Sequence, residues 1–203
     1  EKCCGSTLIR LGEVEKAKAI AKVNMELFRK TGAKRIVTAC AGCYKTISQD
    51  YPKLTGENVP IIHVSQLLAE LLQEGRLPLR KPEESPIVTY HDPCHLGRHT
   101  AMYDWPRKVL ALLPGIKLVE MERTRERSRC CGAGGGLKTL DQELVLKIAE
   151  IRVGDAVKTG ASILVTCCPF CQQTLKEAIL KTNTKIGIAD ITDIVIERLE
   201  SRD

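Results

Sequence analysis

Ten cysteines set this 203-residue chain apart, because they occur as adjacent pairs and as Cys-x-x-Cys runs. One adjacent pair is Cys130-Cys131, and the runs begin at Cys40 and at Cys168. Thiolates are the ligands that zinc ions and iron–sulfur clusters take from proteins. Disulfide frameworks are instead typical of short, loop-rich domains without a large core, whereas 43% of these residues are hydrophobic. The cysteines therefore indicate metal or cluster ligation in a reducing compartment.

The same order of motifs occurs twice along the chain. Cys3-Cys4-Gly5 and Cys130-Cys131-Gly132 each precede a long helical pattern that ends at a Thr-Gly-Ala triplet. In both copies an apolar segment then leads into Cys-x-x-Cys, followed by another apolar segment and a closing helix. A repeat of this length indicates duplication of one structural unit. We therefore predict a first unit at residues 1–80 and a second unit at residues 81–203.

Each unit is predicted to be a small parallel sheet flanked by helices, which makes the fold class α/β. Residues 13–30 show helical spacing, with Gly32 as the stop. Three short apolar segments are typical of buried strands between helices, at residues 35–40, 87–91 and 163–167. These strands lead into Cys40, Cys94 and Cys168. Because ligands of open parallel sheets bind beyond the carboxyl ends of the strands, the cysteines should gather at that edge.

The second unit carries a full set of cysteine motifs in the stretches HDPCHLGRH, RCCGAGGG and CPFC. This pattern resembles the CCG domain, the cysteine-rich domain of heterodisulfide reductase catalytic subunits and related iron–sulfur oxidoreductase subunits. The resemblance implies a noncubane 4Fe–4S cluster and the reduction of a disulfide or related sulfur substrate at that cluster. It implies five metal ligands in this unit: Cys94, Cys130, Cys131, Cys168 and Cys171.

The first unit matches the pattern only in part, with Cys3, Cys4, Cys40 and Cys43 as candidate metal ligands. Its leading cysteine would lie upstream of residue 1, so this unit is predicted to be incomplete at its N-terminal side. We expect the chain to be a piece of a longer protein. Whether the first unit holds a cluster stays open, because a cubane cluster, a zinc ion and no metal at all are the alternatives.

A glycine-rich tract follows the second cysteine pair, and Gly132, Gly134 and Gly135 are candidate cofactor-binding residues. Glycines let the backbone approach an inorganic core closely and point N–H groups at it. The alternative is that the tract is only a flexible loop before a helix. Cys167 should point away from its neighbour Cys168 by strand alternation, and we expect it to be a small core residue.

Three histidines surround Cys94 at spacings of four residues: His91, His95 and His99. If Asp92 caps a helix, His95 and His99 share one helical face. Disulfide reduction consumes protons, so His95, next to a candidate ligand, is the candidate catalytic residue. The alternative is that these histidines only hydrogen-bond the loop or face solvent.

Two other functions stay open beside the sulfur-reducing enzyme. One is an electron-transfer subunit that works with a lactate, glycolate or glycerol-phosphate dehydrogenase. The other is an interaction domain stabilised by zinc. The enzyme hypothesis implies iron–sulfur or flavin redox subunits as partners and a small thiol or disulfide as substrate.

Charge and hydropathy narrow the class of protein further. The net charge of +6 is spread over mixed-charge faces without a basic, aromatic tract, which argues against a nucleic-acid partner. No apolar run is long enough to cross a bilayer. We therefore expect a cytoplasmic subunit, or one that a partner attaches to a membrane complex.

Overall fold

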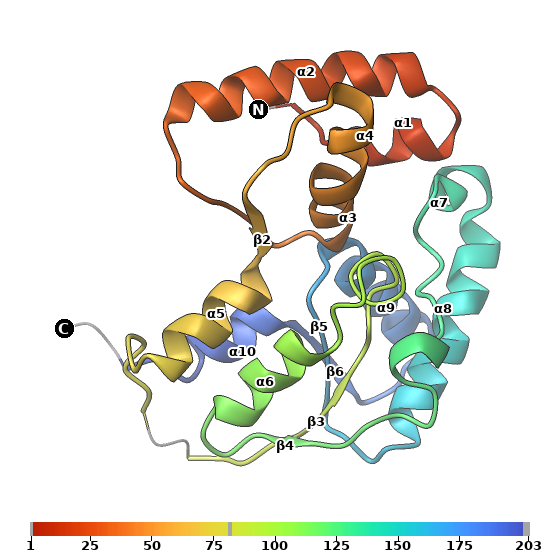
Figure 1. Cartoon of the computed structure of the whole chain (residues 1–203). Helices are drawn as coiled ribbons and strands as arrows, with labels where there is room; N and C mark the ends of the chain where they lie inside the picture. Colours follow the sequence, from red (N-terminus) through yellow and green to blue (C-terminus); the bar gives the residue numbers. More distant parts are fainter. Residues whose placement is uncertain (1, 81–82, 201–203) are drawn as a thin grey trace.

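A computed structural model describes residues 2–80 and 83–200 of the chain. In this structure the first unit is built around two strands (Figure 1). β1 (Ile36–Thr38) pairs in parallel with β2 (Ile61–His63). The helices of this unit are α1 (Ser6–Arg10), α2 (Val14–Thr31), α3 (Ala41–Lys45), the π-helical turn η1 (Thr46–Asp50), α4 (Tyr51–Thr55) and α5 (Val64–Gln73). The predicted long helix is confirmed as α2, which ends because Gly32 adopts a left-handed conformation with φ of 63°.

The second unit holds a four-stranded sheet in the order β4-β3-β5-β6, and all neighbouring strands are parallel. Its strands are β3 (Ile87–Tyr90), β4 (Lys117–Leu118), β5 (Ile163–Thr166) and β6 (Gly187–Asp190). Its helices are α6 (Asp104–Leu112), the 3-10 turn η2 (Arg125–Arg127), α7 (Leu137–Leu140), α8 (Gln142–Val157), α9 (Pro169–Thr182) and α10 (Ile191–Ile196). The predicted α/β class with two small parallel sheets is confirmed, although the sequence pattern does not predict β4.

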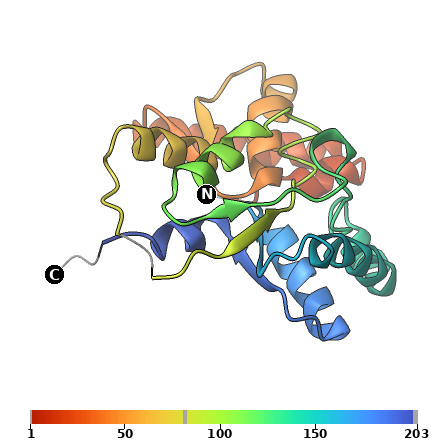
Figure 2. The same ribbon diagram turned by 90° about the horizontal axis from the view of Figure 1, so that it is seen from below.

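Helices cover both faces of the second sheet. The connection from β3 through α6 leads to β4 at one edge of the sheet, and the connection from β5 through α9 leads to β6 at the other edge. Because such connections are right-handed, these two cover opposite faces of the sheet. α8 packs against α9, and α6 packs against α5 of the first unit, as Figure 2 shows. Ala69 and Leu72 of α5 belong to the buried core of the second unit, so the two units are in contact. The boundary between residues 80 and 81 stays a prediction.

In the part of the chain that the structure describes, no helix could span a bilayer. None of them combines the length and the apolar composition that crossing a membrane requires. Their apolar faces pack instead against the sheets and against each other, as in α8 with α9.

A buried ion pair fixes the loop that follows β3. Arg107 in α6 donates to the two carboxylate oxygens of Asp92 over 2.8 and 3.0 Å, and it also binds Glu120 and Thr124. The backbone N–H of Arg125 donates to the same carboxylate over 2.9 Å. Burial raises the pKa of Asp92, but the hydrogen bonds and charge of Arg107 outweigh it, so this pKa lies below its usual value. The loop is thereby tied to α6.

Removing this carboxylate should destabilise the fold. We expect Asp92→Asn to lower the free energy of unfolding by about 3 kcal/mol at pH 7, because a buried guanidinium loses its main counter-charge. The folded-state pKa is depressed, so the carboxylate contributes stability above its unfolded pKa of about 4, and this contribution is lost as the pH falls through the folded-state value. Urea denaturation at pH 7 and at decreasing pH measures both effects.

The control for this substitution is Asp104→Asn. Asp104 also pairs with an arginine, Arg125, but its side chain is 82% exposed. Exposed pairs contribute little to stability, so the loss should be much smaller than for Asp92→Asn. Equal losses at pH 7, or a difference that grows towards low pH, would contradict the role given to Asp92.

Candidate metal centre

Neighbouring strands β3 and β5 lead the chain to the same edge of the second sheet. The chain leaves β3 through His91 to reach Cys94, and it leaves β5 through Cys167 to reach Cys168, the residue that precedes α9. The connections after these two strands lie on opposite faces, which makes this edge the topological switch point at which ligands of open parallel sheets bind. The prediction that the cysteines lie beyond the strand ends is confirmed.

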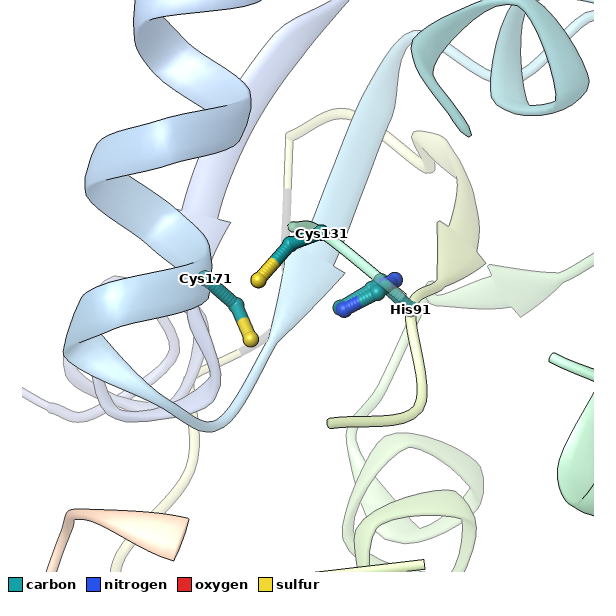
Figure 3. A group of neighbouring side chains, drawn as sticks. All are labelled: His91, Cys131 and Cys171. Carbon is teal, nitrogen blue, oxygen red and sulfur yellow. The ribbon is translucent and has the colours of Figure 1, made fainter. Parts of the chain in front are cut away.

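The five candidate ligands of the second unit form one connected set of thiols. The Sγ atoms of Cys94 and Cys130 lie 3.9 Å apart. Cys130 interacts in turn with Cys131, Cys131 with Cys171, and Cys171 with Cys168. Figure 3 shows the side chains of Cys131 and Cys171 close together. Segments far apart in the sequence thus bring their sulfur atoms to one place.

The four candidate ligands of the first unit form a second connected set. Cys40 precedes α3, and Cys43 lies in the first turn of that helix. Cys43 interacts with Cys4, and Cys4 interacts with Cys3. The two sets also come close to each other, since the thiol of Cys40 lies near enough to that of Cys168 for the pair to lower the pKa of Cys40. The sequence repeat does not predict this contact between the units.

The pKa values of neighbouring thiols are shifted in opposite directions. Hydrogen bonding with Cys131 and Cys94 lowers the pKa of Cys130, and the same contacts raise the pKa of both neighbours. In the first unit, hydrogen bonding with Cys168 lowers the pKa of Cys40. When neighbouring thiols stabilise one thiolate, those neighbouring thiols become harder to ionise themselves. Ionisation of the whole set therefore requires positive charge at the site, which bound metal ions supply.

Gly132 contributes an N–H group to the sulfur set, donating to Cys130 Sγ over 3.3 Å. Only glycine fits this position, because φ is +89° and a Cβ atom would lie 3.1 Å from the carbonyl oxygen of Val145. Within the described residues, no hydrogen bond joins Gly134 or Gly135 to a sulfur atom, and both lie in the loop before α7. Of the three predicted glycines, Gly132 is therefore the one with a contact to the sulfur set.

His95 lies beside Cys94, but no helix holds it there. Residues 94–100 form turns, because the Asp92 carboxylate is held by its ion pair with α6 and does not cap a helix. The helix on which His95 and His99 would share a face therefore does not form. His95 Nδ1 still lies 3.6 Å from Cys94 Sγ, and its ring lies against that of His99 with the centroids 5.0 Å apart.

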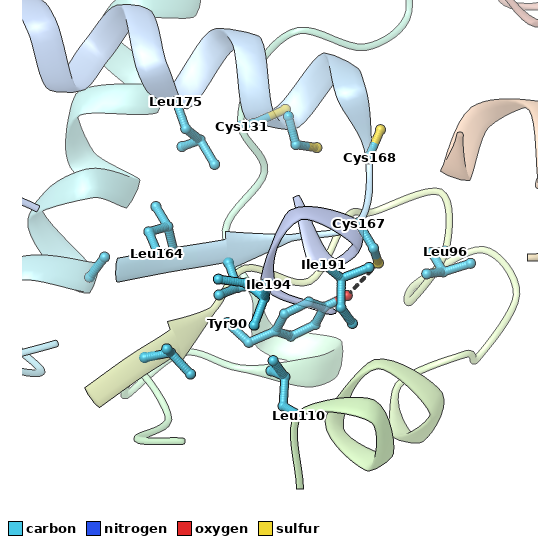
Figure 4. Close-up of a cluster of buried hydrophobic side chains, with 14 of the residues drawn as sticks. Tyr90, Leu96, Leu110, Cys131, Leu164, Cys167, Cys168, Leu175, Ile191 and Ile194 are labelled. Atoms are coloured by element: carbon cyan, nitrogen blue, oxygen red, sulfur yellow. Dashed lines mark hydrogen bonds between the residues drawn. The ribbon is translucent and has the colours of Figure 1, made fainter. Parts of the chain in front are cut away.

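Cys167 points into the core of the second unit. Its thiol hydrogen-bonds with the hydroxyl of Tyr90 over 2.7 Å, and both side chains are buried (Figure 4). Leu110 and Ile191 lie near this pair in the same buried cluster. The prediction that Cys167 is a core residue is confirmed.

A cavity of about 380 Å³ opens beside Cys130. Four arginines line it, namely Arg98, Arg123, Arg127 and Arg129. Arg129 pairs with Asp155 over 3.1 Å, whereas Arg123 and Arg127 have no acidic partner among the residues that the structure describes. The cavity is thus positively charged and suits an anionic molecule. The motifs do not reveal it, because arginines in a mixed-charge stretch look like solvated surface.

The cysteine motifs and their arrangement match a family described as a cysteine-rich domain, CCG. The match covers residues 1–48 and 88–176. The chain belongs to the CCG family. The two matched stretches of this CCG protein contain both sets of thiols, which confirms the resemblance that the motifs indicate.

Relatives of this CCG chain carry oxidoreductase names. A subunit of the dihydromethanophenazine:CoB–CoM heterodisulfide reductase of Methanosarcina mazei is 45% identical over 98% of this chain and 50% of its own length. EtfAB:quinone oxidoreductase of Syntrophomonas wolfei is 35% identical over 98% of this chain and 29% of its own length. A subunit of the fumarate reductase (CoM/CoB) of Methanothermobacter marburgensis is 34% identical over 93% of this chain and 36% of its own length. The chain thus spans half the length of the first relative, and less of the other two.

Two glycine substitutions separate backbone strain from crowding at the site. Gly135→Ala places a side chain at φ of +69° in open space, and we expect a loss of about 1 kcal/mol in the free energy of unfolding. Gly132→Ala adds contacts of 3.1 Å to Val145 and 3.2 Å to Ile148. We expect that loss to be about 2–4 kcal/mol, because overpacking adds to the strain. Urea denaturation measures both, and equal losses would contradict the crowding at Gly132.

Proposed function

We propose that this chain is the iron–sulfur part of an oxidoreductase that reduces a disulfide or a related sulfur substrate. The observation that supports this best is the connected set of thiols in both units, because it offers more ligands than a single tetrahedral zinc ion uses. Thiolates are also the usual ligands of iron–sulfur clusters. The oxidoreductase names of the relatives support the same class of activity.

The donor atoms fit two clusters. A noncubane 4Fe–4S cluster would be held in the second unit by Cys94, Cys130, Cys131, Cys168 and Cys171. A further cluster would be held in the first unit by Cys3, Cys4, Cys40 and Cys43. A bound iron–sulfur cluster supplies single-electron transfer and a soft iron site for substrate sulfur. The Gly132 N–H group would stabilise negative charge on the second-unit sulfurs.

Reduction of a disulfide to two thiols consumes two electrons and two protons. Iron–sulfur or flavin redox subunits of a complex would supply the electrons. His95 would supply a proton, because its ring lies 3.6 Å from the Cys94 sulfur. Burial lowers the pKa of His95 and so favours the neutral ring, which would take up a proton from solvent and pass it on to the substrate sulfur.

The arginine-lined cavity favours an enzyme over a pure electron relay. A relay exchanges electrons through contacts between proteins and needs no space for a small molecule. The cavity of about 380 Å³ beside Cys130 is in the range of small-molecule sites. Arg123 and Arg127 would bind an anionic group of the substrate, because guanidinium groups form strong, charge-assisted hydrogen bonds with such groups.

An electron-transfer subunit is the second candidate. The thiols of Cys40 and Cys168 lie close enough to affect each other's pKa, and clusters held by the two sets would therefore be near enough to exchange electrons. A relative named EtfAB:quinone oxidoreductase and another named probable membrane-anchored ferredoxin are consistent with such a role. A complex of this kind could be attached to a membrane through a partner subunit.

Metal analysis of protein purified without oxygen tests the proposal. We expect iron together with inorganic sulfide. Cys168→Ser should lower the iron content and change the EPR spectrum, because it removes a thiol at the junction of the two sets. The adjacent Cys167→Ser is the matched control and should keep its iron, because that thiol binds Tyr90 in the core. Zinc in place of iron in the wild-type protein would contradict the proposal.

Substrate binding in the cavity can be tested with Arg127→Ala. We expect the KM for an anionic disulfide to rise about tenfold with little change in kcat, because a charged hydrogen bond contributes about 1.5–3 kcal/mol. Arg76→Ala is the control, since Arg76 is exposed, pairs with Glu74 and does not line the cavity. The electron-relay hypothesis is better if the KM of Arg127→Ala equals that of the wild type and an added thiol leaves the EPR spectrum of the oxidised protein unchanged.

A further inference from the structure

Arg152 is completely buried in the second unit, although arginines usually lie at the surface. It is part of α8 and has 0% of its surface exposed. Its Nη1 donates to the carbonyl oxygen of Arg123 over 2.8 Å, and its Nη2 donates to Ser128 Oγ over 3.1 Å. Its Nε donates to His91 Nδ1 over 3.1 Å. These bonds fix the guanidinium against the ring of His91.

The contact with Arg152 determines which nitrogen of His91 carries a proton. A guanidinium is always charged and only donates hydrogen bonds, so His91 Nδ1 accepts this bond with its lone pair. In a neutral imidazole the single proton is then on Nε2. A doubly protonated ring would place its Nδ1–H group against the Nε–H group of Arg152. The geometry therefore makes Nε2 a hydrogen-bond donor.

This donor faces the thiols of the second unit. Nε2 is buried and has no hydrogen-bond partner in the described part of the chain. A ring nitrogen of His91 and the sulfurs of Cys131 and Cys171 lie within 4.8 Å of one another, and Figure 3 shows the ring directed towards both. Because Arg152 occupies Nδ1, Nε2 is the nitrogen available to these sulfurs. A buried donor without an acceptor destabilises the folded protein, and a hydrogen bond to sulfur removes this cost.

The same contact argues against His91 as a metal ligand. A ligating histidine binds the metal through the lone pair of one nitrogen and donates its other N–H group to a carboxylate or carbonyl. Here Nδ1 faces a donor and not an acceptor. A metal on Nε2 would therefore require a ring without any proton, which is an imidazolate. Cys131 and Cys171 have His91 as a donor beside them, and not as a third ligand.

We propose that Arg152 orients His91 so that its Nε2–H group donates a hydrogen bond to sulfur at the site of Cys131 and Cys171, which raises the midpoint potential of that site. This role rests on the proposed iron–sulfur function. Reduction adds negative charge to a cluster, and an N–H dipole backed by a buried guanidinium stabilises that charge. Arg152 is the positioning residue, because it acts on the site through His91.

The test compares His91→Phe with His91→Gln in cluster-loaded protein purified without oxygen. Phenylalanine keeps a ring but has no donor, whereas glutamine keeps an N–H group. Potentiometric titration followed by EPR should show a more negative midpoint potential in His91→Phe and a value nearer to the wild type in His91→Gln. Iron content should be unchanged in both. If phenylalanine prevents folding, His91→Leu removes the donor with a smaller side chain.

Tyr90→Phe is the matched control for these variants. It removes a buried hydrogen bond one residue earlier in the chain, to Cys167, and leaves the donor at the sulfur site in place. Its midpoint potential should equal that of the wild type. After reconstitution in D2O, pulsed ENDOR of the reduced wild type should show an exchangeable hydron that is missing in the donor-free His91 variant.

The outcomes separate this role from the proposed function. Equal midpoint potentials in the wild type and the donor-free variant, with iron retained, would overturn the role of His91 and leave the iron–sulfur function intact. Loss of iron from both His91→Phe and His91→Gln would identify His91 as a ligand, and this result would also overturn the hydrogen-bonding role proposed for His91. A wild-type protein without iron would overturn the proposed function itself.

Discussion

The neighbouring thiols of the second unit cannot all carry a negative charge unless positive charge is placed among them. Where Cys130 becomes easier to ionise, Cys94 and Cys131 become harder to ionise, so the set resists full deprotonation by itself. The groups around the second-unit sulfurs reflect the same constraint. The backbone N–H of Gly132 donates to sulfur, and the guanidinium of Arg152 is buried close by. The protein thus brings partial and full positive charges to a place where negative charge accumulates.

The fold meets this constraint by bringing together sulfur atoms from segments that are far apart in the sequence. β3 and β5 are neighbours, and the chain leaves them towards opposite faces, so their carboxyl ends stay open for the loops that carry Cys94 and Cys168. α5 packs on α6, which holds the first unit against the second. This packing accompanies the contact between Cys40 and Cys168. Each unit therefore supplies its own set of thiols, and the packing of the units places the two sets close to each other.

The sequence predicts those parts of the site that depend on local periodicity and on repetition. The strand before Cys168 and the helix α2 are examples, because apolar spacing and a glycine stop mark them. Strand order is not visible in this way, since β4 has two residues and the pairing of β3 with β5 depends on packing. The burial of Arg152 depends on partners from three other segments, so a pattern on one helix cannot show it. A helix cap at Asp92 does not form, because the buried Arg107 binds that carboxylate in place of local N–H groups.

The duplicated units have kept their thiols and have diverged in what surrounds them. Beside the first set, Asn24 donates to the hydroxyl of Tyr51 over 2.9 Å and to the carbonyl oxygen of Cys3 over 3.2 Å, and the adjoining core is apolar. Beside the second set lie the buried Arg152 and the arginine-lined cavity next to Cys130. The buried Lys45 of the first unit is paired with Asp50, so its charge is compensated. The cavity of the second unit, by contrast, is lined by arginines, some of which have no acidic partner among the described residues, and it attracts an anion. The divergence is consistent with the proposal that substrate binds and is reduced at the second unit, to which the first unit would pass electrons.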